Sequence, residues 1–146
     1  MLIEPYTSVG NLLFTDSRKQ IREKLNEIFE SGSKGFSDIV DYYDYFKQSE
    51  LFVCYDKYDN VNAFEFFKSN PVFNNINLLD QPYKKLIKEL SILDGEIEVE
   101  YNYFTSYKYG IGGNTNEDPE LDESMPEAVI VFRKGYYDSL KLDQAL

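Results

Sequence analysis

Residues 96–103 read Glu-Ile-Glu-Val-Glu-Tyr-Asn-Tyr, with apolar and polar side chains in strict alternation. Successive side chains of a β-strand point to opposite faces of the sheet. The apolar face would carry Ile97, Val99, Tyr101 and Tyr103. The other face would carry Glu96, Glu98, Glu100 and Asn102. One apolar and one polar face predict an antiparallel strand whose charged side meets water.

Further strands are predicted on both sides of this stretch. Residues 107–111 would pair back onto it across a turn at Thr105–Ser106, and the nearly all-apolar residues 128–132 predict a buried, central strand. Earlier in the chain, residues 51–55 and 61–67 are apolar and aromatic, and residues 56–60 between them are rich in turn formers. This arrangement predicts a β-hairpin.

Two helices are predicted from capping signals and apolar stripes. The first begins at Ser17, which has the spacing of a capping box with Gln20, and ends by Gly32. Its stripe comprises Ile21, Leu25, Ile28 and Phe29, and its basic residues Arg18, Lys19, Arg22 and Lys24 predict a solvated basic face or, as the alternative, an anion site. The second has Asp80 as its N-cap and stops at Asp94–Gly95. Its stripe comprises Tyr83, Leu86, Ile87 and Leu90.

The order of these elements predicts an α+β fold in one domain. Residues 37–46 favour a short helix followed by a loop, and residues 136–146 favour a short C-terminal helix. We expect a single domain over residues 1–146, with an antiparallel sheet of about five strands and two main helices packed on one face. An acidic loop around residues 113–127 would interrupt the last strands. A chain of 146 residues buries about two-thirds of its unfolded surface, which suits one domain.

The composition excludes most catalytic arrangements. The chain has no histidine, no tryptophan and a single cysteine, Cys54, so histidine bases, Ser-His or Cys-His pairs and imidazole zinc sites are impossible. Residues 110–113 are glycine-rich, but neither a helix nor a Lys-Ser/Thr pair follows them, as a phosphate loop requires. We therefore expect a protein that is not an enzyme, with no catalytic residue and no cofactor.

A calcium loop is the obvious metal candidate, and its spacing fails. Oxygen-bearing side chains alternate at Asn114, Asn116, Asp118, Glu120 and Asp122. An EF-hand loop needs glycine at its sixth position and glutamate at its twelfth, which here are Pro119 and Met125. We expect no metal site.

The N-terminus has neither the basic start nor the apolar run of a secretion signal, and no stretch approaches the roughly 18 apolar residues of a membrane span. One cysteine cannot form an internal disulfide, which fits a reducing compartment. These features predict a cytoplasmic protein. The sequence pI near 4.4 argues against nucleic acid or an anionic membrane as the partner.

Charge is concentrated in one segment. Ten of the 26 acidic residues lie between Asp94 and Glu127, where Lys108 is the one basic residue, so this segment carries −9 of the net −11. It is either a solvated face that maintains solubility or a face that captures a cationic partner. Because Tyr101 and Tyr103 share the apolar strand face, we expect Tyr107 and Tyr109 to be the exposed anchors. The candidate partner-binding residues are Glu96, Glu98, Glu100, Tyr107, Tyr109, Glu117, Asp118, Glu120, Asp122 and Glu123.

Several short stretches give a loose pattern found in bacterial α+β proteins of unknown role. They are residues 9–14 (Val-Gly-Asn-Leu-Leu-Phe), Tyr55-Asp56, Glu65-Phe66 and residues 134–137 (Lys-Gly-Tyr-Tyr). Small, acidic, histidine-free and aromatic-rich, the chain resembles the immunity proteins of bacterial polymorphic and contact-dependent toxin systems. It departs from the large group of them that carries conserved tryptophans, and the resemblance assigns no functional residue.

The resemblance implies a bacterial protein that binds a toxin domain, often a basic nuclease, and blocks its active site. With the charge pattern, it predicts a non-enzymatic protein-binding module, an immunity protein or antitoxin that neutralises a basic toxin domain. Two alternatives stay open. One is a small enzyme or ligand-binding domain that works with carboxylates and tyrosines in a concave site. The other is a subunit of a homo-oligomer.

Overall fold

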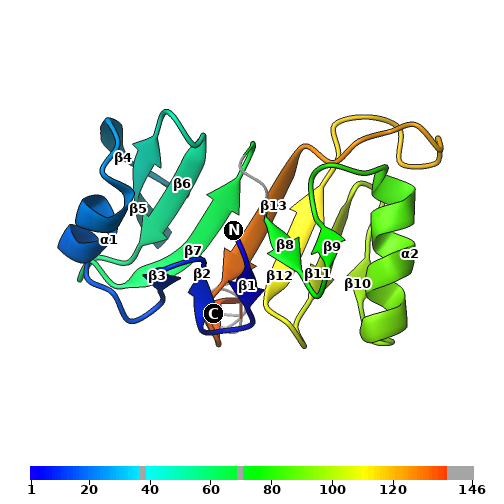
Figure 1. The fold of residues 1–146 in the computed structure, drawn as a ribbon, viewed down its shortest axis with the longest axis horizontal. Coiled ribbons are helices and arrows are strands. Elements are labelled where there is room, and N and C mark those ends of the chain that lie inside the picture. Colours follow the sequence, from blue (N-terminus) through cyan, green and yellow to red (C-terminus); the bar gives the residue numbers. More distant parts are fainter. Residues whose placement is uncertain (37–38, 69–70, 138–146) are drawn as a thin grey trace.

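The computed structural model describes residues 1–36, 39–68 and 71–137, which form two helices and thirteen strands (Figure 1). In chain order these are β1 (Ile3–Glu4), β2 (Ser8–Val9), β3 (Leu12–Leu13), α1 (Arg18–Leu25), β4 (Phe29–Phe36), β5 (Ile39–Phe46), β6 (Leu51–Tyr55), β7 (Val61–Phe66), β8 (Val72–Phe73), β9 (Ile76–Asn77), α2 (Tyr83–Leu93), β10 (Glu98–Val99), β11 (Tyr103–Ser106), β12 (Ile111–Asn114) and β13 (Ala128–Phe132).

Eight strands form one antiparallel sheet in the order β10-β11-β12-β13-β7-β6-β5-β4. The predicted hairpin is present as β6–β7, and the apolar strand β13 lies inside the sheet between β12 and β7. The α+β class and the antiparallel sheet are therefore confirmed. The sheet is larger than the five strands expected, and two small sheets, β1-β2-β3 and β8-β9, accompany it.

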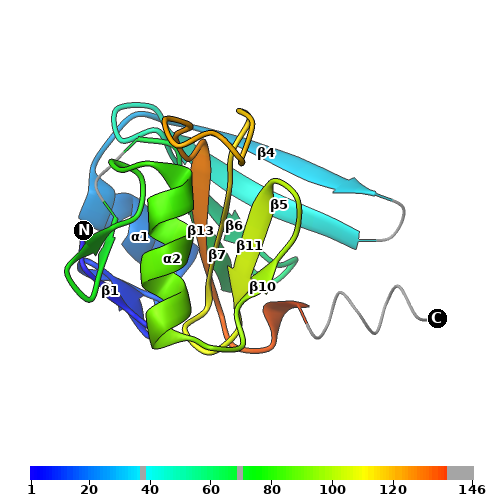
Figure 2. The same ribbon diagram turned by 90° about the vertical axis from the view of Figure 1, so that its right-hand side faces the viewer.

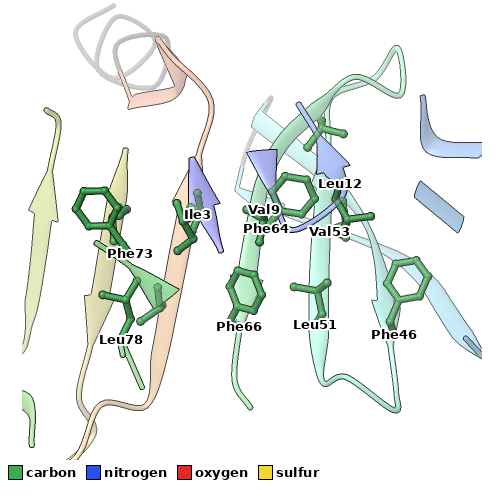
Figure 3. Close-up of a cluster of buried hydrophobic side chains, with 14 of the residues drawn as sticks. Ile3, Val9, Leu12, Phe46, Leu51, Val53, Phe64, Phe66, Phe73 and Leu78 are labelled. Carbon is green, nitrogen blue, oxygen red and sulfur yellow. The ribbon is translucent and has the colours of Figure 1, made fainter. Parts of the chain in front are cut away.

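One hydrophobic core joins the large sheet, the small sheets and both helices. Alternate residues of the central strands, such as Val53 of β6 and Phe64 of β7, pack against Leu12 of β3 (Figure 3). Ile21 of α1 and Leu86 of α2 belong to the same cluster, although the two helices lie at opposite ends of the sheet (Figure 1). The short N-terminal strands, which the sequence pattern did not reveal, thus cover apolar sheet surface that water would otherwise contact.

The intervening residues of the same strands point to the opposite face of the sheet. Cys54 of β6, Ala63 of β7 and Phe132 of β13 form a second, smaller cluster with Tyr136. We call the side that carries these residues the second face. The β4–β5 hairpin extends beyond the rest of the sheet (Figure 2).

The region after the first helix corrects two predictions. The capping box of Ser17 and Gln20 is confirmed, but the helix ends at Leu25 because Asn26 adopts the left-handed conformation at φ 48°. Phe29, expected in the helix, instead begins β4. Residues 39–46, expected as a short helix and a loop, form strand β5, which pairs with β4 along its length. The expected helix over residues 136–146 lies almost wholly outside the described residues.

The region around residues 94–114 is also corrected. The predicted strand over residues 96–103 is paired at Glu98–Val99 alone, and the chain then turns, so that β11 begins at Tyr103. The next turn spans residues 107–110 rather than Thr105–Ser106. Gly110 closes it at φ 67°, a conformation that glycine adopts without strain. The buried carboxylate of Asp94 holds the register, because it accepts a hydrogen bond from the Ser106 hydroxyl at 2.7 Å.

The second helix differs from its prediction at one end. Its N-cap is Pro82 rather than Asp80, whereas its C-terminal stop at Asp94 is confirmed. Within the described part of the chain, neither helix is long and apolar enough to cross a membrane.

Candidate functional site

The acidic loop is held in one shape by its own polar groups. The buried hydroxyl of Thr115 donates to the Met125 carbonyl at 2.7 Å and accepts from the Glu117 N–H at 3.1 Å. The Glu117 carboxylate in turn accepts from the Met125 N–H at 2.8 Å, and the Ser124 hydroxyl donates to the Asp118 carbonyl. These bonds close residues 115–125 into a compact loop with its carboxylates outside.

Two contacts fix this loop against neighbouring elements. The Thr115 N–H donates to the Asn102 carbonyl at 2.9 Å, which places the loop beside the turn between β10 and β11. The Tyr83 N–H donates to the Ser124 carbonyl at 2.8 Å, which places it at the first residue of α2, as Figure 1 shows. The acidic strand and the acidic loop, separate in the sequence, therefore form one continuous surface.

We call this surface the acidic face and define it by its exposed carboxylates. They belong to Glu98, Glu100, Glu117, Asp118, Glu120, Asp122 and Glu123. Glu96 is also exposed, but it precedes β10 and is the acid farthest along this segment from the junction between Asn102 and Thr115. The structure thus brings together seven of the eight predicted acids.

Three lysines lie near the acidic face: Lys84 beside the loop, and Lys108 and Lys134 around one pocket with Glu98. Among the described residues, its one ion pair joins the Lys84 ammonium to Asp122 at 3.5 Å, and both side chains are more than half exposed. A surface pair of this kind contributes about 0–1 kcal/mol. The other carboxylates of the acidic face make no ion pair with the described residues.

The expectation that Tyr107 and Tyr109 are exposed is wrong. Tyr109 is half-buried, packs against Phe73 with ring centroids 4.7 Å apart, and donates its hydroxyl to the Leu93 carbonyl at 3.2 Å. Tyr107 is also half-buried and packs edge-on against Phe132.

Tyr101 and Tyr103, expected on the apolar face, are instead 72% and 51% exposed. The reason is the early turn after Val99, which removes both rings from the alternation that the sequence suggested. The exposed aromatic residues of the acidic face are therefore Tyr101 and Tyr103.

A pocket of about 340 Å³ lies beside Tyr103 on the second face, and we call it the hollow. Its residues come from β7, β11, β12 and β13 and from Tyr137 after the last strand. Gly112 has no side chain and Ala128 has a small one, so the surface of the sheet is depressed here between larger neighbouring side chains. No sequence pattern reveals the hollow, because its residues come together only through strand pairing.

Two of the four basic residues of α1, Arg18 and Arg22, join a buried ion pair network, whereas Lys19 and Lys24 are exposed as a solvated face requires. Asp44 of β5 is fully buried and accepts from Arg18 at 2.8 Å and from Arg22 at 2.7 Å. It also accepts from the hydroxyls of Ser31 at 2.7 Å and Tyr55 at 3.3 Å. Burial would raise the pKa of Asp44, but the hydrogen bonds from the two arginines outweigh burial and hold the pKa well below its ordinary value. This network attaches α1 to the sheet.

The single cysteine, Cys54, is buried in the second, smaller cluster. Burial raises the pKa of the Cys54 thiol to about 12, so the thiol is protonated at neutral pH. In the part of the chain that the structure describes, no three acidic or cysteine side chains are grouped so that they could hold a metal ion.

The sequence matches neither a protein-family profile nor a curated protein. The fold is similar to the crystal structure of the uncharacterized protein yfeY from Escherichia coli, with a TM-score of 0.62 and 13% sequence identity. The similarity covers 88% of this chain and 97% of yfeY. At this identity the comparison shows a shared fold alone.

Proposed function

We propose that this protein is a non-enzymatic binding module, an immunity protein or antitoxin that neutralises a basic toxin domain through its acidic face. A bacterial source and a cytoplasmic location belong to the same proposal. The observation that carries it is the junction at Thr115, which joins the acidic strand and the acidic loop into one surface with Tyr101 and Tyr103 exposed at its edge.

Charge and aromatic anchors both support this function. Like charges held this close repel one another, and a cationic partner would relieve that repulsion. Long-range attraction of this kind raises association rates by about 10-fold or more at low salt. Exposed tyrosines supply apolar contact area at low entropic cost and are frequent binding hot spots. The acidic face would therefore attract the partner, and the two tyrosines would anchor it.

We also propose that α1 and α2 pack on the same face of the large sheet. Ile21 and Leu86 share one core cluster, which supports this arrangement. The second face would then be available to the same partner, next to the acidic face.

The test is affinity capture from a lysate of the source organism, followed by elution with a salt gradient. We expect a basic protein that elutes at high salt, and that no longer binds to a variant with Glu98, Glu100, Glu120 and Asp122 changed to lysine. The matched control changes four acids outside the acidic face, Glu4, Glu23, Glu30 and Asp80, to lysine and has the same net charge. If both variants capture the partner equally well, the acidic face is not the binding surface.

A further inference from the structure

We propose that the hollow on the second face is a subsite for one arginine side chain of the basic partner. This inference rests on the proposed function and adds the residue chemistry by which the partner would be recognised. It follows from the shape of the hollow, from its unused hydrogen-bonding groups and from the charge around it.

The shape follows from strand pairing. Glu65, Ile130, Gly112 and Thr105 pair in succession across β7, β13, β12 and β11, and residues paired in this way share one face of a sheet. Gly112 has no side chain, and a Cβ there would lie 3.1 Å from Ile130 Cγ2. The row is therefore interrupted by a depression. Its volume of about 340 Å³ is at the small end of ligand sites, enough for one long side chain.

Within the described residues, several acceptor atoms in the hollow are unused, although one Glu65 carboxylate oxygen already pairs with Lys34. The Glu65 side chain is 22% exposed, and its ion pair with Lys34 is long, 3.6 Å, and uses one carboxylate oxygen, Oε2. The side chains of Thr105 and Asn114 make no hydrogen bond with the described residues. A carboxylate oxygen, an amide oxygen and a hydroxyl oxygen are all acceptors, and a guanidinium presents five donors in a planar fork.

Two aromatic rings complete the match to arginine. Tyr103 and Tyr137 both line the hollow. A guanidinium is planar and weakly hydrated, so it stacks on aromatic rings more readily than the compact ammonium group of lysine. Arginine can satisfy the acceptors and the rings together, whereas lysine offers a single point of charge.

The surroundings also favour a cation. Glu98 pairs with Thr105 and so lies on the same face as the hollow, in a neighbouring pocket that it lines with Lys108 and Lys134. On the other side, Asn114 is directly followed by the acidic loop, which supplies five exposed carboxylates. Lys34 comes from β4, at the far edge of the sheet, and its ammonium reaches across the Phe52 ring, 5.5 Å from the ring centre, to lie 3.6 Å from the Glu65 carboxylate. A cation attracted by the acidic face would thus reach the hollow from the side away from Lys34.

The test is an NMR titration with N-acetyl-arginine-N-methylamide as the probe. We expect saturable shifts of the Gly112 and Thr105 amide signals with a dissociation constant of about 10 mM, as suits a single side chain. Glu65→Gln keeps the size of the side chain and should weaken binding about 10-fold, since it removes the charge that pairs with the probe. Thr105→Val should weaken binding more modestly and provides a second variant.

The matched control is Glu50→Gln. Glu50 lies beside this sheet and also forms a long lysine pair, 3.7 Å to Lys68, but it is outside the hollow. Binding to this variant should be unchanged. The citrulline analogue of the probe has the same shape without the charge and should not bind. Equal binding of the citrulline analogue, unchanged binding to Glu65→Gln, or no shift of the two amides would each overturn the proposal.

The outcomes separate this inference from the proposed function. If a basic partner is captured through the acidic face but the probe does not bind, the hollow is not its arginine subsite. If the probe binds and no basic partner is found, the proposed function fails while the hollow remains a guanidinium site.

Discussion

Replacing Asp44 with asparagine tests whether the buried ion pair network attaches α1 to the sheet. The change keeps the size of the side chain and removes its charge. Arg22 would then lose its counter-ion, and Arg18 would keep only its exposed pair with Asp59. The new side-chain amide would also present a donor where both arginines need an acceptor.

The magnitude follows from burial. Removing one partner of a buried ion pair costs about 3–5 kcal/mol, because the remaining charge is left without compensation. The Arg18 and Arg22 side chains are 17% and 35% exposed, so water can partly hydrate them and the lower end of this range applies. We expect Asp44→Asn to lower the free energy of unfolding by about 3 kcal/mol. With a urea m-value of about 2 kcal/mol per molar, the midpoint would fall by about 1.5 M.

The assay is urea unfolding at pH 7, followed by far-UV circular dichroism. The matched control is Asp59→Asn, because Asp59 also pairs with Arg18, at 3.0 Å, but its side chain is 59% exposed. Removing this exposed pair should lower the free energy of unfolding by at most about 1 kcal/mol. A loss below about 1 kcal/mol for Asp44→Asn, or equal losses for the two variants, would refute the reasoning.

Three further predictions concern single groups. Folding lowers the pKa of Asp44, so this carboxylate stabilises the fold above its unfolded pKa of about 3.9, and the stabilisation is lost as pH falls. The free energy of unfolding should therefore decline more steeply below about pH 5 in the wild type than in Asp44→Asn. Acid titration followed by circular dichroism would show the difference. A Cβ at Gly113 would lie 2.8 Å from the Phe104 ring, so Gly113→Ala should cost about 1–3 kcal/mol in urea unfolding, whereas Gly95→Ala, with nothing within 4 Å, should stay within about 0.5 kcal/mol. Burial raises the pKa of Cys54 to about 12, so the thiol should react with Ellman's reagent at pH 8 at the rate of unfolding; rapid reaction of the native protein would contradict its burial.

The local elements of the fold were predictable from the sequence. The capping box at Ser17 and the β6–β7 hairpin depend on neighbouring residues, and both were predicted. Strand β5 was not, because its polar Asp44 interrupts the apolar pattern and faces inward to meet Arg18 and Arg22, more than twenty residues away in the chain. A buried charge whose partners are distant in the chain cannot be recognised from the residues next to it in the sequence.

The candidate site shows the same division. The acids of the acidic face are exposed as expected, because a dense run of carboxylates cannot be buried without partners. Which tyrosines accompany them depends on where the chain turns. The Glu100 N–H donates to the Tyr103 carbonyl and closes the turn that exposes Tyr101, and the left-handed Gly110 closes the turn in which Tyr109 packs inward. Alternation in the sequence carried no information about the turns.

The most direct test of the proposed function is the rate at which the captured partner associates with this protein at low and high ionic strength. For the wild type we expect the rate constant to fall steeply as salt screens the acidic face. The variant with Glu98, Glu100, Glu120 and Asp122 changed to lysine should associate at least about 10-fold more slowly at low salt, with a flat or inverted salt dependence. An unchanged rate in that variant would show that the acidic face does not guide the partner.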